Sequence, residues 1–524
     1  MTDTGRPTYE EASRFLSQAS FGPTEAMVAD VRRQGLEDWF LSQVALPRRD
    51  MLARFQAASA FNRHMVYPLF WEGAVRGADQ LRQRVAYALS QIVVISLGEM
   101  GRWPDLFVVY AGHLEEQAFG NYGALLRQIT YAPAMGLYLS HLGNEKADPD
   151  TGAAPDENYA RELMQLFTIG VVPLTPGGEA LPGETYGPED VEGLAAIMTG
   201  LSWSGLDRWR GGRMPEGDPR RLRPMDAYPV AHEQRAKRFL GYEAEGPNPI
   251  EAIDGALAHL MDHPNTAPFV CRRLIQALVT ASPAPEYVAR VGRAFATGRY
   301  ALPSGRAVGA GERGDMTATV AAILFDEAAR RPARLTAPAF GRPREATLRF
   351  AHLIRAFAGD WSPGPEPERV GFLSYSHQQS GFAEQPWYAP SVFGAFKADY
   401  AVPGSEGAAA GLVAPELQAQ NAASTLGYLS RLASLVRDPL PGPLVMDLSP
   451  LEEAVRDGVP ATVDLIERVF FHGAMPQDTR EKFSSLLGRF ADGKAWPIAD
   501  RTADKMMQLT LAAAMTDPGF AIQR

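Results

Sequence analysis

Apolar residues recur at three- and four-residue spacing in segment after segment of this 524-residue chain. That spacing is typical of amphipathic helices, and long stretches with the period of two that marks half-buried strands are missing. The helical spacing covers residues 10–20, 24–33, 36–44, 81–97, 106–118, 122–129, 157–169, 188–199, 250–261, 267–280, 286–296, 316–325, 344–357, 421–436, 461–471, 477–490 and 498–516. We therefore expect a mainly α-helical protein, a large multi-helix domain without an extended sheet.

Long connections rich in glycine and proline separate these helices. They cover residues 143–155, 171–187, 204–229, 300–314, 359–379 and 400–415. Connections of this length in a compact protein usually form binding loops or lids, or stay disordered. The clearest break lies between residues 329 and 346. It predicts a main helical domain over 9–330 and a C-terminal helical lobe over 340–524 that closes over it, unless both form one continuous domain.

Charge and composition exclude several classes of protein. The net charge of −10 argues against a general nucleic-acid binder, because neutralising phosphates requires a basic surface. The single cysteine, Cys271, allows no disulfide within the chain and no multi-cysteine metal site. We see no apolar run long enough to span a bilayer and no leader, so we expect a soluble protein without a membrane partner. As written it would be cytoplasmic, and it would be periplasmic or secreted if a leader has been removed.

The densest polar group of the chain opens the helix predicted over 157–169. Glu157, Asn158, Arg161 and Glu162 stand directly before an apolar stripe that ends at Gly170. Glu157 and Glu162 are five residues apart, so their side chains diverge by about 140° and cannot face each other across one bond. Acid–base chemistry here would need a further group from another segment. The group is either half of an active site, with Arg161 clamping an anion, or a structural ion-pair network.

The loop over residues 375–388 is the best source of that further group. His377 and Glu384 are candidates for the missing acid or base. Aromatic and amide side chains bind sugar or peptide faces, so the candidates for substrate binding are Gln378, Gln379, Trp387 and Tyr388, with Asn158 and Arg161. We expect this loop to meet the 157–162 segment in one cavity.

Three other motifs are weaker evidence for a functional site. His259 and His263 have the i,i+4 spacing of helical zinc ligands, but no glutamate follows the first histidine. The glycines of 309–314 match a dinucleotide fingerprint but follow a loop rather than a strand. The arginines of 208–223 form either an anion-binding lid or a solvated loop. We therefore predict no bound metal and no cofactor.

Several motifs, taken together and in order, resemble the bacterial "domain of unknown function 1800" family. They are ASRFLSQASFGPT at 12–24, RVAYALSQ at 84–91, AFGNY at 118–122, ENYARELMQLFTIG at 157–170, TY at 185–186, TG at 199–200, HPNTAPF at 263–269 and PSVF at 390–393. The resemblance implies an all-helical fold that is often secreted and often encoded beside a sulfatase-like secreted protein. It implies no established reaction.

From these features we predict a hydrolase with carboxylate acid–base chemistry, in particular a glycoside hydrolase acting on a saccharide polymer or oligomer. Glu157 and Glu162, with Glu384 or His377, would supply the acid and base. Two alternatives stay open. One is a non-enzymatic binding or assembly protein that partners a sulfatase-like protein, and the other is a metal-dependent enzyme that uses His259 and His263.

Overall fold

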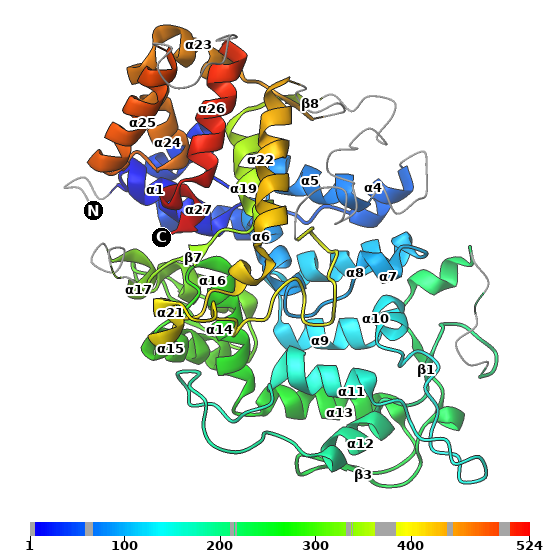
Figure 1. The fold of residues 1–524 in the computed structure, drawn as a ribbon. Helices are drawn as coiled ribbons and strands as arrows, with labels where there is room; N and C mark the ends of the chain where they lie inside the picture. The colour runs from blue at the N-terminus through cyan, green and yellow to red at the C-terminus, as the bar shows by residue number, and fades with distance from the viewer. Residues whose placement is uncertain are drawn as a thin grey trace.

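The computed structural model describes residues 6–57, 66–209, 214, 217–331, 337, 339–361, 384–437, 444–491 and 503–524. Helices dominate this part of the chain, and its strands form only two-stranded antiparallel pairs, so the predicted mainly α-helical fold is confirmed (Figure 1). Among the same residues, no helix is both long and apolar enough to cross a membrane.

The N-terminal part packs around α6, whose residues from Gln80 to Leu89 are all buried. Helices α1, α3, α5, α8 and α14 contact it from different sides. The helices of this part are α1 (Tyr9–Ala19), α2 (Glu25–Gln34), α3 (Leu36–Ala45), α4 (Met51–Ala57), α5 (Val66–Arg76), α6 (Gln80–Ser90), α7 (Leu97–Met100), α8 (Pro104–Gln117), α9 (Tyr122–Thr130) and α10 (Pro133–Tyr138).

The helices of the structure differ from the predicted ones in several places. The helix predicted over 81–97 ends at Ser90, and turns fill the interval before α7. Helix α5 was not predicted, because it is buried on nearly every side and so has no single apolar stripe for the sequence to display. The short α4 was also missed.

The middle of the chain forms a second layer of helices with short hairpins on its outer side (Figure 1). Its helices are α11 (Asn158–Glu162), the π-helix η2 (Leu163–Thr168), α12 (Pro188–Ile197), η3 (Pro219–Leu222), η4 (Pro229–Ala231), α13 (Pro249–Asp262), α14 (Thr266–Leu278), α15 (Pro285–Thr297), α16 (Met316–Phe325) and α17 (Glu327–Arg330). Its strand pairs are β1 (Leu201–Ser202) with β2 (Asp226–Ala227), β3 (Lys237–Phe239) with β4 (Tyr242–Ala244), and β5 (Tyr300–Ala301) with β6 (Ala307–Val308).

The C-terminal part stands against the N-terminal helices, with α23 to α26 on the same side as α1 in Figure 1. Its helices are α19 (Ala346–Ala356), α21 (Glu406–Ala409), η6 (Pro415–Ala419), α22 (Ala422–Arg437), α23 (Ser449–Asp457), α24 (Val459–Phe470), α25 (Gln477–Ala491), α26 (Ala503–Thr516) and α27 (Pro518–Ala521). Its strand pairs are β7 (Arg342–Pro343) with β10 (Ile522–Gln523), and β8 (Ala358–Trp361) with β9 (Leu444–Met446).

Several contacts tie this C-terminal part to the rest of the chain. Strand β10 pairs with β7, and the Gln523 amide donates to the Leu278 carbonyl over 2.7 Å. The Ser13 hydroxyl lies 2.7 Å from His472 Nδ1. One continuous hydrophobic core runs through most of these helices, from Ala12 to Phe520.

Candidate active site

The predicted polar turn of 157–162 divides between two environments. Glu157 and Arg161 form the expected i,i+4 ion pair at 2.8 Å, and both side chains are exposed, at 40% and 47%. Asn158 begins α11, where its N–H donates to the Asp156 carboxylate over 2.8 Å. Glu162 is buried instead, and burial raises its pKa despite the nearby positive charge of Arg161. The two carboxylates point to different surroundings, as their spacing predicted.

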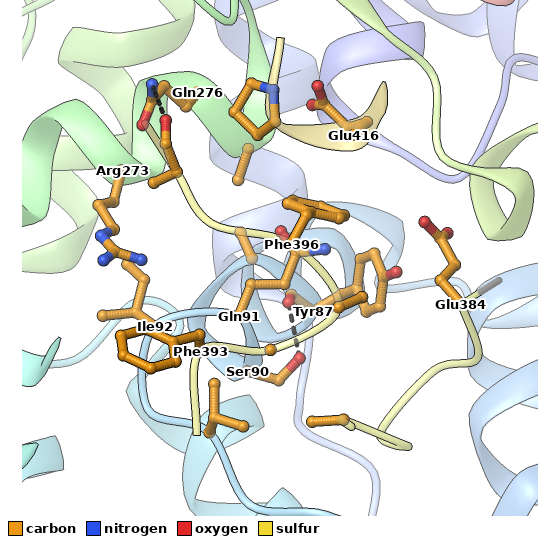
Figure 2. Close-up of a pocket in the computed structure, with 18 of the residues that line it drawn as sticks. Tyr87, Ser90, Gln91, Ile92, Arg273, Gln276, Glu384, Phe393, Phe396 and Glu416 are labelled. Carbon is orange, nitrogen blue, oxygen red and sulfur yellow. Dashed lines mark hydrogen bonds between the residues drawn. The ribbon is translucent and has the colours of Figure 1, made fainter. Parts of the chain in front are cut away.

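The loop residues predicted beside this helix lie elsewhere. Glu384, Trp387 and Tyr388 line a cavity that encloses about 800 Å³ of space, part of it open to solvent. We call it the central cavity (Figure 2). The predicted site residues His377, Gln378 and Gln379 lie outside the described residues. Neither Glu157 nor Glu162 is among the described residues that line the cavity.

Two more cavities share walls with the central cavity. The lobe cavity, about 700 Å³, has Glu384 in its wall together with Arg349 and Tyr428. The helix cavity, about 1010 Å³, shares Arg273, Gln276, Phe393 and Ala398 with the central cavity. Its other walls include Gln165, Leu166 and Gly170, so the helix that starts with the polar turn reaches this row of cavities only with its last turns.

Hydrogen bonds to two helical regions hold the segment from Glu384 to Ala398 in place. The Trp387 carbonyl accepts from the Leu97 N–H over 2.8 Å, and the Ala389 carbonyl accepts from the Ser96 hydroxyl over 2.7 Å. At the other end, the Ala398 carbonyl accepts from the Gln276 amide of α14 over 3.1 Å. The segment is therefore attached to the start of α7 at one end and to α14 at the other.

The two predicted aromatic residues form an apolar wall. The Trp387 ring packs against Phe70 and Phe107, with ring centroids 5.1 and 5.5 Å away. The Tyr388 ring lies so close to Gly98 that a Cβ there would stand 2.9 Å from it. Both residues also line the cavity.

A buried ionic network forms the floor of the central cavity. The Arg342 guanidinium contacts the Glu345 carboxylate and lies 2.7 Å from Glu416 Oε1. Glu345 Oε2 also accepts from the Tyr87 hydroxyl at 2.5 Å and from the Gln91 amide at 2.9 Å. Because all three charged side chains are at most 2% exposed, the pairing offsets a large desolvation penalty. Burial lowers the pKa of Arg342, but the two carboxylates outweigh burial and raise it overall.

Glu384 stands beside this network without an arginine partner of its own among the described residues. Its Oε1 accepts from the backbone N–H of Thr347 over 3.2 Å. Burial, and next the negative charge of Glu345, raise the pKa of Glu384 to about 8. Arg342 pairs with Glu345 and Glu416, and the charge of Arg349 only partly opposes the rise in the pKa of Glu384. Glu384 is therefore mostly protonated at neutral pH and can donate a proton.

Glu416 is a second carboxyl group in the wall of the central cavity. Arg342 binds its Oε1, while its buried Oε2 has no hydrogen-bond partner among the described residues. Burial raises the pKa of Glu416, and Arg342 opposes this rise. Figure 2 shows Glu384 and Glu416 on one side of the cavity and Arg273 on the opposite side. The cavity wall thus holds two carboxyl groups with raised pKa values, Glu384 and Glu416, and the buried Oε2 of Glu416 has no partner among the described residues.

Sequence reasoning found Glu384 but missed the residues around it. Tyr87 and Gln91 belong to the block at 84–91, whose i,i+4 polar pair was a usable signal. Arg342 and Glu345 stand in the charged stretch that precedes α19. Glu416 gave no signal, since it follows a proline at the end of a long connection.

The other motifs have local partners. His259 Nε2 lies 3.0 Å from the Leu240 carbonyl, and His263 Nδ1 accepts from the Asn265 N–H over 3.2 Å. No group of three or more histidine, cysteine or acidic side chains is placed to hold a metal within the described ranges. In the basic segment 208–223, Arg220 pairs with Asp218 at 2.7 Å and Arg221 pairs with Asp105, while Arg210 and Arg213 lie outside the described residues.

Comparison with known proteins gives one match. The model of a family described as "Protein of unknown function (DUF1800)" matches residues 14–522, nearly the whole chain. No curated protein and no solved structure matches.

Proposed function

We infer a function from the central cavity itself, because the chain belongs to the DUF1800 family and the description of that family assigns no activity. We propose that the protein hydrolyses glycosidic bonds in a saccharide polymer or oligomer, with Glu384 as the general acid. The observation that carries the proposal is the Glu384 carboxyl, which lies in the cavity wall with its pKa raised to about 8 by burial and by Glu345. Enzymes tune glutamate in this way to keep a proton available near neutral pH.

The reaction uses one acid and one base. Glu384 donates its proton to the glycosidic oxygen while the bond from that oxygen to the anomeric carbon breaks. A water molecule adds to the anomeric carbon, and Glu416 Oε2 takes the proton that this water loses. Exchange with solvent then restores both carboxyl groups. Such a single displacement inverts the configuration at the anomeric carbon.

The lining of the cavity supports a saccharide substrate. Amide side chains and a hydroxyl supply hydrogen bonds for sugar hydroxyl groups, and aromatic rings supply flat apolar faces. These residues are Ser90, Gln91, Gln276, Gln385, Trp387, Tyr388, Phe393 and Phe396. Glu384 stands between the central and lobe cavities, so a chain of several sugar units would place a bond beside it.

The test is a comparison of purified wild-type protein with Glu384→Gln and Glu416→Gln. Release of reducing ends is measured across a panel of nitrophenyl glycosides and soluble polysaccharides. Losing a general acid typically lowers the rate about 100-fold or more, so we expect at least that drop in kcat/KM for Glu384→Gln. The wild-type pH–rate profile should fall on the alkaline side near pH 8, where Glu384 loses its proton.

Glu453→Gln serves as the matched control, since Glu453 is an exposed residue of α23. Full activity in folded Glu384→Gln, or no release of reducing ends from any member of the panel, would contradict the proposal. Saccharide binding without turnover would favour a binding protein instead. Loss of activity in folded Glu157→Gln or Glu162→Gln would indicate that the acid and base lie in the polar turn of α11 instead.

A further inference from the structure

Arg273 is a half-buried guanidinium in a cavity wall that also holds the Asp399 carboxylate. No described carboxylate, carbonyl or side-chain oxygen forms a hydrogen bond or ion pair with it. Its recorded contact is with the Phe269 ring, whose centroid lies 5.0 Å away. Among the arginines of the interior, Arg355 donates to the carbonyls of Gly22 and Val75, and Arg84 donates to the Ala277 carbonyl while its Nε and Nη1 have no partner among the described residues. Because guanidinium groups taken from water normally acquire partners, this one is set up to bind a group from outside.

The walls around Arg273 are cationic. Arg272 precedes it on α14, and Lys397 stands across the helix cavity, where its ammonium lies 5.3 Å from the centroid of the Phe393 ring. Asp399 is the one acidic residue among the described residues that line this cavity. A cavity with three cationic side chains and one carboxylate attracts anions, and it does so on a chain whose net charge is −10.

Aromatic and aliphatic side chains also surround Arg273. Phe269 and Phe393 line the helix cavity, and Val171 and Val172 are 48% and 38% exposed. Their backbone is fixed, because the Asn265 amide donates to the carbonyls of Ile169 and Val172 over 3.0 and 2.8 Å. The site therefore joins a charged recognition group to flat apolar surfaces, which suits an anion carried on a ring better than a small hydrated ion.

Arg273 also occupies a shared wall. It lines both the helix cavity and the central cavity, and Figure 2 places it on the side of Phe393, opposite Glu384. A ligand whose anionic group contacts Arg273 can therefore extend from the helix cavity toward Glu384.

We propose that Arg273, with Arg272 and Lys397, forms a subsite for an oxyanion carried on a sugar ring, so that the substrate is an acidic saccharide. The oxyanion is a carboxylate, sulfate or phosphate group, and Arg273 binds it by paired N–H donors. The substrate assignment rests on the proposed glycoside hydrolysis, whereas the binding of the anion can be measured without any turnover.

The test is isothermal titration of the full-length protein with glucuronate, with glucose as the neutral analogue. We expect glucuronate to bind more tightly than glucose and to weaken as salt rises. A hydrogen bond between charged groups contributes about 1.5–3 kcal/mol, so Arg273→Gln should weaken glucuronate binding about 10- to 100-fold and leave glucose binding unchanged. Arg273→Lys should restore part of the affinity, which shows that lost charge rather than lost folding is responsible. Arg293→Gln, on the exposed face of α15, is the control.

Inorganic sulfate and inorganic phosphate are titrated in parallel. If either competes with glucuronate but binds more weakly, the sugar ring contributes and the acidic saccharide is supported. If either binds as tightly as glucuronate, the subsite is for a free oxyanion and the saccharide assignment is overturned. Equal binding of glucose and glucuronate, or unchanged glucuronate affinity in folded Arg273→Gln, overturns the subsite. Glucuronate binding that survives in Glu384→Gln while no glycoside is hydrolysed would reject the proposed reaction and keep the subsite.

Discussion

At the scale of single residues, the central cavity holds carboxyl groups in contrasting surroundings. Glu345 accepts hydrogen bonds from Arg342, Tyr87 and Gln91. Glu384 has only weaker compensation, and burial beside Glu345 favours its neutral form. Arg342 therefore distinguishes the two glutamates, because it contacts Glu345 and forms no ion pair with Glu384 among the described residues.

This contrast predicts how stability depends on pH. The pKa of Glu384 rises from an ordinary 4.5 to about 8 on folding, so its contribution to stability is fully present below pH 4.5. That contribution is lost as the pH rises toward and through about 8. Glu384→Gln cannot ionise, so its free energy of unfolding, measured by urea denaturation and taken relative to wild type, should rise from pH 5 to pH 8 and then level off. A difference that stays constant over this range, as expected for the control Glu453→Gln, would contradict the assigned pKa.

The sequence could identify Glu384 but not its partners. A polar loop rich in aromatic residues is visible in a single segment, and Glu384, Trp387 and Tyr388 all stand in it. The network around Glu384 joins α6, the start of α19 and η6, and its contacts link residues 74 and 258 positions apart in the chain. Spacing along one segment contains no information about such pairings, so Glu416 was out of reach.

At the scale of secondary structure, the helix after the polar turn is the clearest departure from expectation. The spacing of its apolar residues predicted one α-helix over 157–169, whereas Leu163–Thr168 is a π-helix. Apolar spacing over so few residues does not distinguish the two forms. Tertiary contacts distinguish the two forms, and here the Tyr122 hydroxyl of α9 donates to the Phe167 carbonyl over 2.7 Å. π-helical turns of this kind frequently lie at functional sites, and this one leads into the helix cavity.

The end of this helix gives a second prediction. Gly170 has φ +69, and a Cβ there would lie 2.8 Å from the Phe269 ring beneath Arg273. Gly170→Ala should lower the free energy of unfolding by about 1–2 kcal/mol for the left-handed backbone, and further for the clash. Gly152→Ala is a matched control, since its φ is +75 and nothing lies within 4 Å. Equal losses for the two variants in urea denaturation would show that the Phe269 contact is unimportant.

At the scale of the whole molecule, buried histidines join the C-terminal part to the rest. His472 Nε2 and His352 Nδ1 each lie 3.2 Å from the Arg344 guanidinium, and His472 Nδ1 faces the Ser13 hydroxyl. Burial, and next the charge of Arg344, hold the pKa of both histidines well below the ordinary value of 6.5. Both rings are therefore neutral in the folded protein. The junction already contains the Arg344 guanidinium, and the charges of Arg14 and Arg355 also oppose protonation of the two rings.

This junction predicts loss of stability in mild acid. The histidine pKa is lower in the folded state, so the stabilising contribution is present above the unfolded value of 6.5 and is lost as the pH falls below it. Each such histidine can contribute a slope of up to about 1.4 kcal/mol per pH unit. We expect the free energy of unfolding to fall from pH 6.5 to pH 5, and to fall less steeply in His472→Gln. An equal slope in both proteins would show that His472 is already protonated in the folded state.

The π-helical turn has one more consequence, which concerns changes in chain length rather than in side chains. A π-turn holds more residues than an α-turn, so deleting one residue within Leu163–Thr168 would let the segment close as a regular α-helix. One turn of either helix is a full rotation, so the residues after the deletion would keep nearly the same direction relative to Glu162. Gly170, which follows the π-helical turn, would keep its place in the wall of the helix cavity. Among related chains, gain or loss of a single residue at this position would therefore change the helical turn and leave the rest of the cavity wall in place.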